Sequence, residues 1–272
     1  MVRGNVSSRP FTGAEAYRIT KFLSEGIGPR VAGTDGERAA VHVIEDTFRG
    51  MGYHTMLQPF KTPSGDESSN VIACRMESLP DKYIVGGAHY DSVACTGGAN
   101  DNASGVGVLI ETAMCLIGID LPVPVVYVAF GAEEGSHAGS KHFVSALSDP
   151  SVVAGMINLD AVGADDGLEI GTYGDADPWL AKHCQETAEW LGFKLSDTHF
   201  GGKSDYASFA DAGIPVSCFA RTDQPTAHTP DDDMSRITQS GMAEIGTIVV
   251  TSLTGLLPLS YDVPIRQRSN KE

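Results

Sequence analysis

The sequence predicts an α/β protein, a three-layer α/β/α sandwich built around a mixed, mostly parallel central sheet. Several short β-rich runs are apolar on successive residues, which is typical of strands that are covered on both faces. Amphipathic helical patterns stand between these runs, and such an alternation is typical of sheets with helices packed on each side. The chain contains no repeat and no linker long enough to separate domains, so residues 1–272 are expected to form one domain.

The clearest predicted helix spans residues 34–51. Thr34 and Glu37 have the spacing of a capping box, in which each residue satisfies a free backbone N–H at the start of a helix. Gly52 follows, at a position where helices commonly end. The apolar residues of this stretch recur on one face at helical spacing: Ala40, Val43, Ile44, Phe48 and Met51.

The remaining elements follow from the same patterns of apolar residues. Strands are predicted at residues 54–60, 69–76, 83–85, 124–130, 156–159 and 214–219. Helices are predicted at residues 106–117, 176–191 and 235–256. The Lys- and Arg-containing tail after Tyr261 is predicted to be a frayed end.

Composition and charge restrict the expected partners. Apolar residues make up 42% of the chain and charged residues 20%, as in soluble globular proteins. The formal charge of −16 repels phosphate backbones and anionic lipid, so neither nucleic acid nor a membrane is an expected partner. No apolar run reaches the roughly 20 residues of a membrane span, and the first residues lack the apolar core of a signal peptide. A cytoplasmic location is therefore expected.

Four polar clusters each adjoin an apolar, strand-like run. Residues 89–92, residues 131–135 and Asp160 come directly after such runs, and residues 228–232 follow the last one at a short distance. Because side chains at the carboxyl ends of strands in an open α/β sheet converge on one crevice, a shared site is expected. A fifth cluster, residues 97–105, leads into a predicted helix. Each cluster alone has a structural explanation, such as helix capping, but the five together favour a functional site.

The clusters resemble those of the co-catalytic zinc exopeptidases of peptidase clan MH, which include bacterial leucyl aminopeptidases, glutamate carboxypeptidase II and, more distantly, glutaminyl cyclase. The resemblance covers nearly the whole chain and implies a single zinc-peptidase catalytic domain with the zinc exopeptidase fold. It rests on segments that stand in family order: Ile27-Gly28-Pro29-Arg30, Ala32-Gly33-Thr34, His89-x-Asp91, Asn100-Asp101-Asn102-x-Ser104-Gly105, Glu133-Glu134, Asp160 and His228.

This resemblance implies two zinc ions held by five side chains: His89 and Asp160 on one ion, Glu134 and His228 on the other, and Asp101 bridging both. Each ion then has three protein ligands and one open position, which is typical of catalytic zinc. Cobalt or manganese would suit the same ligands. Three carboxylates against two divalent ions leave a net charge of +1, which favours a hydroxide at the shared open position.

The resemblance also implies roles for residues beside the metals. Glu133 is implied to be the general base, which takes a proton from the attacking water and delivers it to the leaving amine. Asp91 is implied to accept a hydrogen bond from the ring of His89 and so to fix its orientation. For Asp232 two interpretations stay open, a similar partner for His228 or a solvated acidic turn.

Two expectations concern the polar loop that carries Asp101. The peptide bond between Asp101 and Asn102 is expected, from the family, to be cis. Cys95 lies in this polar region, so its thiol is expected to approach the metal site without being a ligand. The five cysteines are odd in number and form no CxxC motif, so they are expected to be free thiols in a reducing compartment: Cys74, Cys95, Cys115, Cys184 and Cys218.

The chain departs from the family pattern on the oxyanion side of the pocket. Many relatives have a tyrosine directly before the last histidine, where this chain has Ala227. Tyr206 stands where relatives commonly have a histidine, and we hypothesise that it supplies a compensating catalytic hydroxyl; the alternative is an aromatic residue of the pocket wall. Phe200 and Phe209 are candidates for the side-chain pocket, although aromatic residues are more often part of the core.

The predicted function is an aminopeptidase that acts on peptides with a free N-terminus, whose amine is implied to meet Glu133, Asp160 and the backbone carbonyl of Lys203. A glutaminyl-cyclase-like acyltransferase is the second interpretation, but that class uses one zinc and has Trp at the position of Ala227. A carboxypeptidase or dipeptidase is the third, and Arg221 is the nearby candidate for binding a substrate carboxylate. A binding domain without activity is disfavoured by the intact ligand set. The preferred N-terminal residue, the native metal and the oligomeric state are left open.

Overall fold

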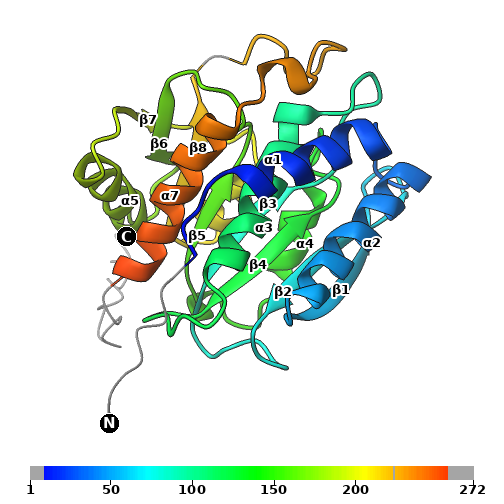
Figure 1. Ribbon diagram of the computed structural model, residues 1–272. Helices are drawn as coiled ribbons and strands as arrows, with labels where there is room; N and C mark the ends of the chain where they lie inside the picture. Colours follow the sequence, from blue (N-terminus) through cyan, green and yellow to red (C-terminus); the bar gives the residue numbers. More distant parts are fainter. Residues whose placement is uncertain (1–8, 223, 257–272) are drawn as a thin grey trace, which may run out of the picture.

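The computed structural model describes residues 9–222 and 224–256, which form a central sheet between two layers of helices (Figure 1). The predicted α/β/α sandwich is therefore confirmed. In spatial order the strands are β1-β2-β4-β3-β5-β8-β6-β7. Their bounds are His54–Lys61 (β1), Glu67–Cys74 (β2), Tyr83–His89 (β3), Val125–Phe130 (β4), Val153–Leu159 (β5), Leu168–Thr172 (β6), Leu195–His199 (β7) and Val216–Arg221 (β8).

The middle of the sheet is parallel and its two sides contain antiparallel pairs. Strands β4, β3, β5 and β8 run in one direction, as do β6 and β7 with each other. The pairs β1–β2, β2–β4 and β6–β8 are antiparallel. The central strands β3, β4 and β5 are buried along their whole length, as expected for strands covered on both faces.

Helices cover both faces of the sheet. Helices α1, α2, α3, α5 and α7 contribute to the larger apolar core, and α4 and α6 to the smaller one on the opposite face. In Figure 1, α1, α3 and α7 lie in front of the sheet. The bounds are Ala14–Lys21 (α1), Asp35–Gly50 (α2), Gly105–Cys115 (α3), Ala138–Ser145 (α4), Trp179–Trp190 (α5), Tyr206–Asp211 (α6) and Gln239–Gly255 (α7), with short turns at Phe22–Ile27 (η1), Ala99–Ser104 (η2), Pro150–Val152 (η3) and Met234–Arg236 (η4).

The start of α2 agrees with the predicted cap, with one difference. The side chain of Thr34 accepts a hydrogen bond from the backbone N–H of Glu37 at 3.4 Å. The carboxylate of Glu37 reaches back one residue further than in a standard capping box and accepts from the N–H of Gly33 at 2.6 Å. Its other oxygen accepts from Ser68 on β2, so the cap also ties α2 to the sheet.

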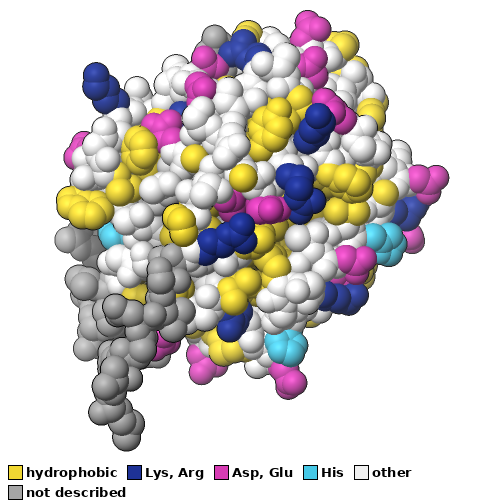
Figure 2. Space-filling model, viewed as in Figure 1, with side chains coloured by type: hydrophobic (Ala, Val, Ile, Leu, Met, Phe, Trp, Pro, Cys, Tyr) yellow, Lys and Arg dark blue, Asp and Glu magenta, His cyan; other side chains and the backbone are white. Residues whose placement is uncertain are grey.

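Several other expectations can be compared with the fold. The five cysteines are free, and Cys95 alone among them is exposed. The tail after Tyr261 lies outside the described residues. In the described part of the chain, no helix has both the length and the apolar character needed to cross a bilayer. Figure 2 shows basic side chains scattered among acidic ones on the viewed face.

Candidate active site

The predicted ligands meet at the carboxyl edge of the parallel strands. His89 is the last residue of β3 and pairs in register with Phe130, the last residue of β4. Asp160 directly follows β5. Because neighbouring parallel strands end at the same edge of a sheet, the residues that follow them face one crevice. This crevice is a cavity of about 760 Å³, and its lining includes His89, Asp101, Glu133, Glu134, Asp160 and His228.

The five ligand side chains form two groups that share Asp101. Nε2 of His89 lies 3.2 Å from Oδ1 of Asp101 and 3.5 Å from Oδ1 of Asp160. Nε2 of His228 lies 3.2 Å from Oδ2 of Asp101 and 3.0 Å from Oε2 of Glu134. Asp101 therefore turns one carboxylate oxygen toward each histidine.

These spacings fit zinc. Ligands at about 2.0–2.1 Å from a tetrahedral ion stand about 3.3 Å from one another. The nitrogen and oxygen atoms of both groups are separated by distances close to this value. In addition, Oε1 of Glu134 is buried and has no hydrogen-bond partner among the described residues, which is costly for a carboxylate oxygen unless a cation satisfies it.

The charges of the site also favour a bound cation. Burial raises the pKa of Glu134 to about 7, and burial together with the nearby carboxylates of Asp205 and Asp160 raises the pKa of Glu133. The hydrogen bond to Asp101 raises the pKa of His228 to about 9. Since the site gathers negative charge away from water, a bound cation would stabilise it.

Asp91 does more than the sequence predicted. Its Oδ1 lies 3.5 Å from Nδ1 of His89, near the ring nitrogen but without the hydrogen bond that the resemblance implied. The same oxygen accepts from the backbone N–H of Glu133 at 3.0 Å, and Oδ2 accepts from the N–H of Glu134 at 3.1 Å. One buried carboxylate thus positions a ligand histidine and the two adjacent glutamates.

Asp232 is neither a solvated turn residue nor a partner of the His228 ring. It is buried, and its two oxygens accept from the backbone N–H groups of Asn100 and Asp101 at 2.8 and 3.1 Å. Asp232 therefore holds the loop that carries the shared ligand. The peptide bond between Asp101 and Asn102 is cis, as expected.

The polar residues around Asp101 tie its loop to the segment that carries Asp160. The side chain of Asn102 donates to the carbonyl of Leu159 and accepts from the N–H of Ala161. Ser104 accepts from the N–H of Val162 at 3.0 Å. These contacts fix the distance between two ligand-bearing loops whose bonded residues are 57 to 59 positions apart in sequence.

Arg30, within the first segment of the family pattern, also supports the site. Its fully buried guanidinium donates to the carbonyls of Tyr90, Gly97 and Gly98. Although burial lowers its pKa to about 10, the nearby carboxylate of Asp91 favours the charged form. Arg30 thus joins the loops on either side of the metal ligands. The thiol of Cys95 lies 3.4 Å from the backbone carbonyl oxygen of the ligand His228.

The aromatic candidates divide between pocket and core. Tyr206 and Phe200 both line the cavity, and the hydroxyl oxygen of Tyr206 accepts from the N–H of Lys203 at 3.2 Å. Phe209 is fully buried and stacks on Phe143 with ring centroids 5.7 Å apart. The pocket interpretation of Phe209 was therefore wrong, because this side of α6 faces the sheet. Ala227 lines the cavity and leaves room there.

Arg221 does not line the candidate active-site cavity. Its guanidinium is buried and donates to Glu244 on α7 and to the carbonyls of Asp166 and Gly241. The suggestion that it binds a substrate carboxylate was wrong, because strand β8 directs this side chain toward α7.

Sequence reasoning missed His137, which also lines the cavity. Its Nε2 lies 3.4 Å from Oε1 of Glu133. His137 stands alone four residues after Glu133, in a segment with neither a helical nor a strand-like pattern of apolar residues. The sequence therefore gave no reason to place it in the site.

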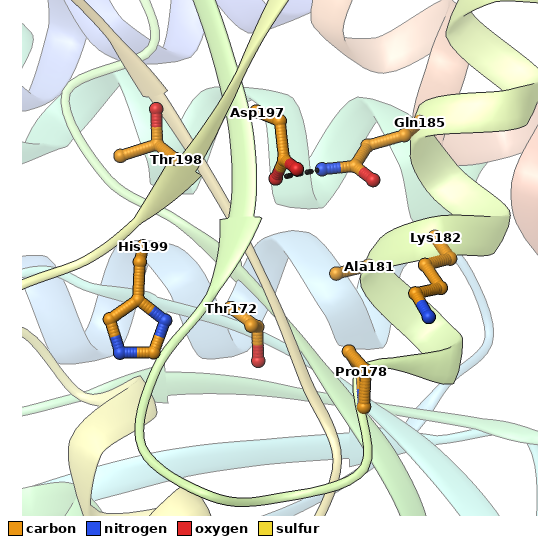
Figure 3. A pocket seen from close by; sticks show the side chains of 8 residues that line it. All are labelled: Thr172, Pro178, Ala181, Lys182, Gln185, Asp197, Thr198 and His199. Carbon is orange, nitrogen blue, oxygen red and sulfur yellow. Dashed lines mark hydrogen bonds between the residues drawn. The ribbon is translucent and has the colours of Figure 1, made fainter.

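A second, smaller hollow of about 290 Å³ lies between α5 and β7 (Figure 3). Gln185 crosses it to donate to Asp197 at 2.7 Å. Two groups of side chains in the described residues could hold a metal ion, and both line the larger cavity. The smaller hollow contains no such group among the described residues. The larger cavity is therefore the candidate active site.

The site consists of two neighbouring groups of histidine and carboxylate side chains on a three-layer α/β/α fold. This combination is typical of metallopeptidases. The profile of Peptidase family M28 matches residues 70–253, and the chain belongs to this family. It is similar to aminopeptidase YwaD from Bacillus subtilis, with 33% identity over 208 residues that cover 71% of this chain and 46% of YwaD. The chain spans about half the length of the curated relatives it matches.

Solved structures share the fold. BSAP, a zinc aminopeptidase from Bacillus subtilis, superimposes with a TM-score of 0.83 at 21% identity, covering 89% of this chain and 94% of BSAP. A glutaminyl cyclase from Bacteroides thetaiotaomicron gives a TM-score of 0.81 at 21% identity, covering 92% of this chain and all of the cyclase. At this level of identity the likeness concerns the fold alone.

Proposed function

We propose that this chain is a zinc-dependent aminopeptidase that removes N-terminal residues from peptides and uses two metal ions. The observation that carries the proposal is the position of Asp101, whose two oxygens each lie 3.2 Å from a different histidine. A single ion would need only one of these oxygens. His89 and Asp160 complete one ligand set, and Glu134 and His228 complete the other.

Each residue has a defined task in this proposal. Zinc held by His89, Asp101, Glu134, Asp160 and His228 would supply a water of lowered pKa and positive charge beside the substrate carbonyl oxygen. Glu133 takes the proton from the attacking water and delivers it to the departing amine. Asp91 holds the backbone of Glu133 and Glu134, and so fixes the base relative to the ligands. The hydroxyl of Tyr206, which lines the same cavity, donates a hydrogen bond to the substrate oxygen.

A substrate with a free N-terminus suits the charge of the cavity. Glu133 and Asp160 both face it, and carboxylates favour an ammonium group over a blocked, neutral amide. The carboxypeptidase alternative loses support, because Arg221 is engaged with Glu244 away from the cavity.

The cyclase alternative is also less favoured. It requires one ion, whereas the described residues contain two groups that could each hold one, His89 with Glu133 and Asp160, and Asp101 with Glu134 and His228. The position of its Trp is occupied by Ala227. We further propose a reducing, cytoplasmic location, which the free state of the five cysteines supports.

The proposal is tested by metal analysis and by hydrolysis of matched peptides. The zinc-loaded protein is expected to bind two ions per chain and to cleave peptides with a free N-terminus while sparing the N-acetylated forms. Equal cleavage of free and acetylated peptides would contradict the aminopeptidase assignment. One bound ion together with cyclisation of N-terminal glutamine would favour the acyltransferase.

The general base is tested separately. Glu133→Gln is expected to lower kcat by a factor on the order of 100 to 10,000, the usual contribution of a positioned base, with zinc content unchanged. Glu67→Gln, at an exposed position on β2, is the control. Full activity of Glu133→Gln would exclude the mechanism.

A further inference from the structure

The loop between β4 and α4 folds back on itself directly after the two glutamates. The backbone N–H of His137 donates to the carbonyl of Glu133 at 2.8 Å, and the next two N–H groups donate back toward the end of β4. His137 has a φ of +49°, in the left-handed region that non-glycine residues seldom occupy. Such strained conformations cluster at functional sites, where the surrounding structure maintains them.

This fold of the loop brings the imidazole of His137 against the carboxylate of Glu133. Nε2 lies 3.4 Å from Oε1, and the side chains are only 21% and 7% exposed. Lys203, in the loop before α6, lines the same cavity as His137.

Within residues 9–222 and 224–256, Nε2 of His137 is the one basic side-chain nitrogen within 4.0 Å of the Glu133 carboxylate. Burial lowers the pKa of this ring, so a neutral imidazole makes the contact. The neighbouring side chains of Asp205, Asp160 and Asp91 are carboxylates as well, and like charges repel one another. The ring of His89 attracts the Glu133 carboxylate, whereas these three groups repel it. His137 adds a contact to one oxygen of Glu133, and a partner of this kind fixes the orientation of a base.

We propose that His137 is a positioning residue for the general base: its Nε2 holds one oxygen of Glu133. The other oxygen of Glu133 is then left to face the attacking water. This inference rests on the proposed function. It assigns His137 no contact with a metal or with the reacting atoms, so its effect reaches the reaction through Glu133 alone.

Two substitutions separate the contact from the backbone conformation. The amide nitrogen of glutamine can take the position of Nε2, so His137→Gln keeps the partner of Glu133. Asparagine tolerates the left-handed backbone best, but its shorter side chain ends short of Glu133. We expect kcat of His137→Asn to fall roughly tenfold with KM within about twofold, since misplacing a catalytic group by about 1 Å can cost up to 100-fold.

The kcat of His137→Gln is expected to stay within about threefold of that of the unmodified protein, which is a smaller loss than displacement of the base would cause. The control is His142→Asn on α4, the helix that follows His137; the ring of His142 stacks on Phe60 outside the cavity. This variant is expected to retain full turnover. Thermal unfolding of each variant reports whether its fold is kept. If asparagine equals or exceeds glutamine, the backbone and not the contact governs the effect, and the proposal is wrong.

A double substitution gives the second test. If His137 acts only through Glu133, then His137→Asn in the Glu133→Gln background lowers the residual rate no further. A full additional tenfold loss would overturn the inference. This outcome is distinct from failure of the proposed function, which would appear as absence of N-terminal cleavage by the unmodified protein.

Discussion

Asp91 shows how much of the site depends on one buried carboxylate. Its two oxygens serve the ring of His89 and the backbone N–H groups of Glu133 and Glu134. The family resemblance of the His89-x-Asp91 segment implied that Asp91 lies beside the His89 ring. The two contacts with Glu133 and Glu134 depend on how the loop after β4 folds, which has no counterpart in the spacing of residues.

Asp91→Asn is expected to weaken zinc binding by about 10- to 100-fold, the usual effect of losing the partner that orients a ligand. The amide nitrogen would face a backbone N–H, so one of the two donors loses its acceptor. Competition with a chelating dye measures the change in affinity. Asp175→Asn, at an exposed position, should leave affinity unchanged; equal affinity of both variants would contradict the role given to Asp91.

Tyr206 is the second residue with a testable role. Burial raises the pKa of its hydroxyl above the usual value, so it stays a hydrogen-bond donor at neutral pH. Removing one oxyanion donor costs about 100- to 1000-fold in kcat in well-studied cases, and a hydroxyl at the cavity wall is expected to contribute roughly tenfold. Steady-state kinetics of Tyr206→Phe measure this loss. Unchanged turnover would leave Tyr206 as a wall residue.

At the scale of elements, the first helix is held by a residue from another helix. Glu111 on α3 is buried, and its carboxylate accepts from the backbone N–H groups of Thr12, Gly13 and Ala16 at the start of α1. Helix α1 has no local side-chain cap, so this carboxylate satisfies the N–H groups that begin the helix. Because α1 packs against the η2 loop, the contact also supports Asp101.

Glu111→Ala is therefore expected to lower the free energy of unfolding by about 2–3 kcal/mol, since buried N–H groups lose a charged acceptor. Urea denaturation followed by circular dichroism measures the change. Glu189→Ala, at an exposed position on α5, serves as the comparison and should shift stability little. A similar effect in both variants would show that Glu111 has no special part in holding α1.

The elements that could be predicted from sequence are those with a strong apolar pattern. The helix at 34–51 and the buried central strands have it, and they agree with α2, β3, β4 and β5. Strands β6 and β7 were not predicted, because each has only five residues and β7 is a largely exposed edge strand. Helices α1, α4 and α6 have six to eight residues, too few to show a helical period.

The same distinction applies to the site. Its ligands were predicted because they stand in a fixed order next to recognisable strand ends. His137 and Arg30 depend on contacts between loops that are distant in sequence or tightly folded, and these contacts become visible only once the strands are paired. The wrong interpretations of Phe209 and Arg221 have a similar cause, since the face to which a side chain points depends on packing.

For the whole molecule, metal binding is expected to raise thermal stability, because the ligand set exists only in the folded chain. At a free zinc concentration of about 100 times Kd, the gain is about 2.7 kcal/mol, or a rise in Tm of roughly 5–10 °C for a domain of this size. Thermal melts of chelator-treated protein, with and without added zinc, measure it. Asp101→Asn should reduce the rise, and identical melts with and without zinc would contradict the proposed site.

The position of His228 gives metal binding a second effect on stability. This residue lies on the long loop after β8, its side chain is 59% exposed, and it has a positive φ. An ion shared with Glu134 would join that loop to the end of β4 across almost a hundred intervening residues. Such a junction acts as a reversible cross-link, so occupancy of the site would determine how readily a protease gains access to this edge of the molecule. Metal supply would then control the lifetime of the protein as well as its activity.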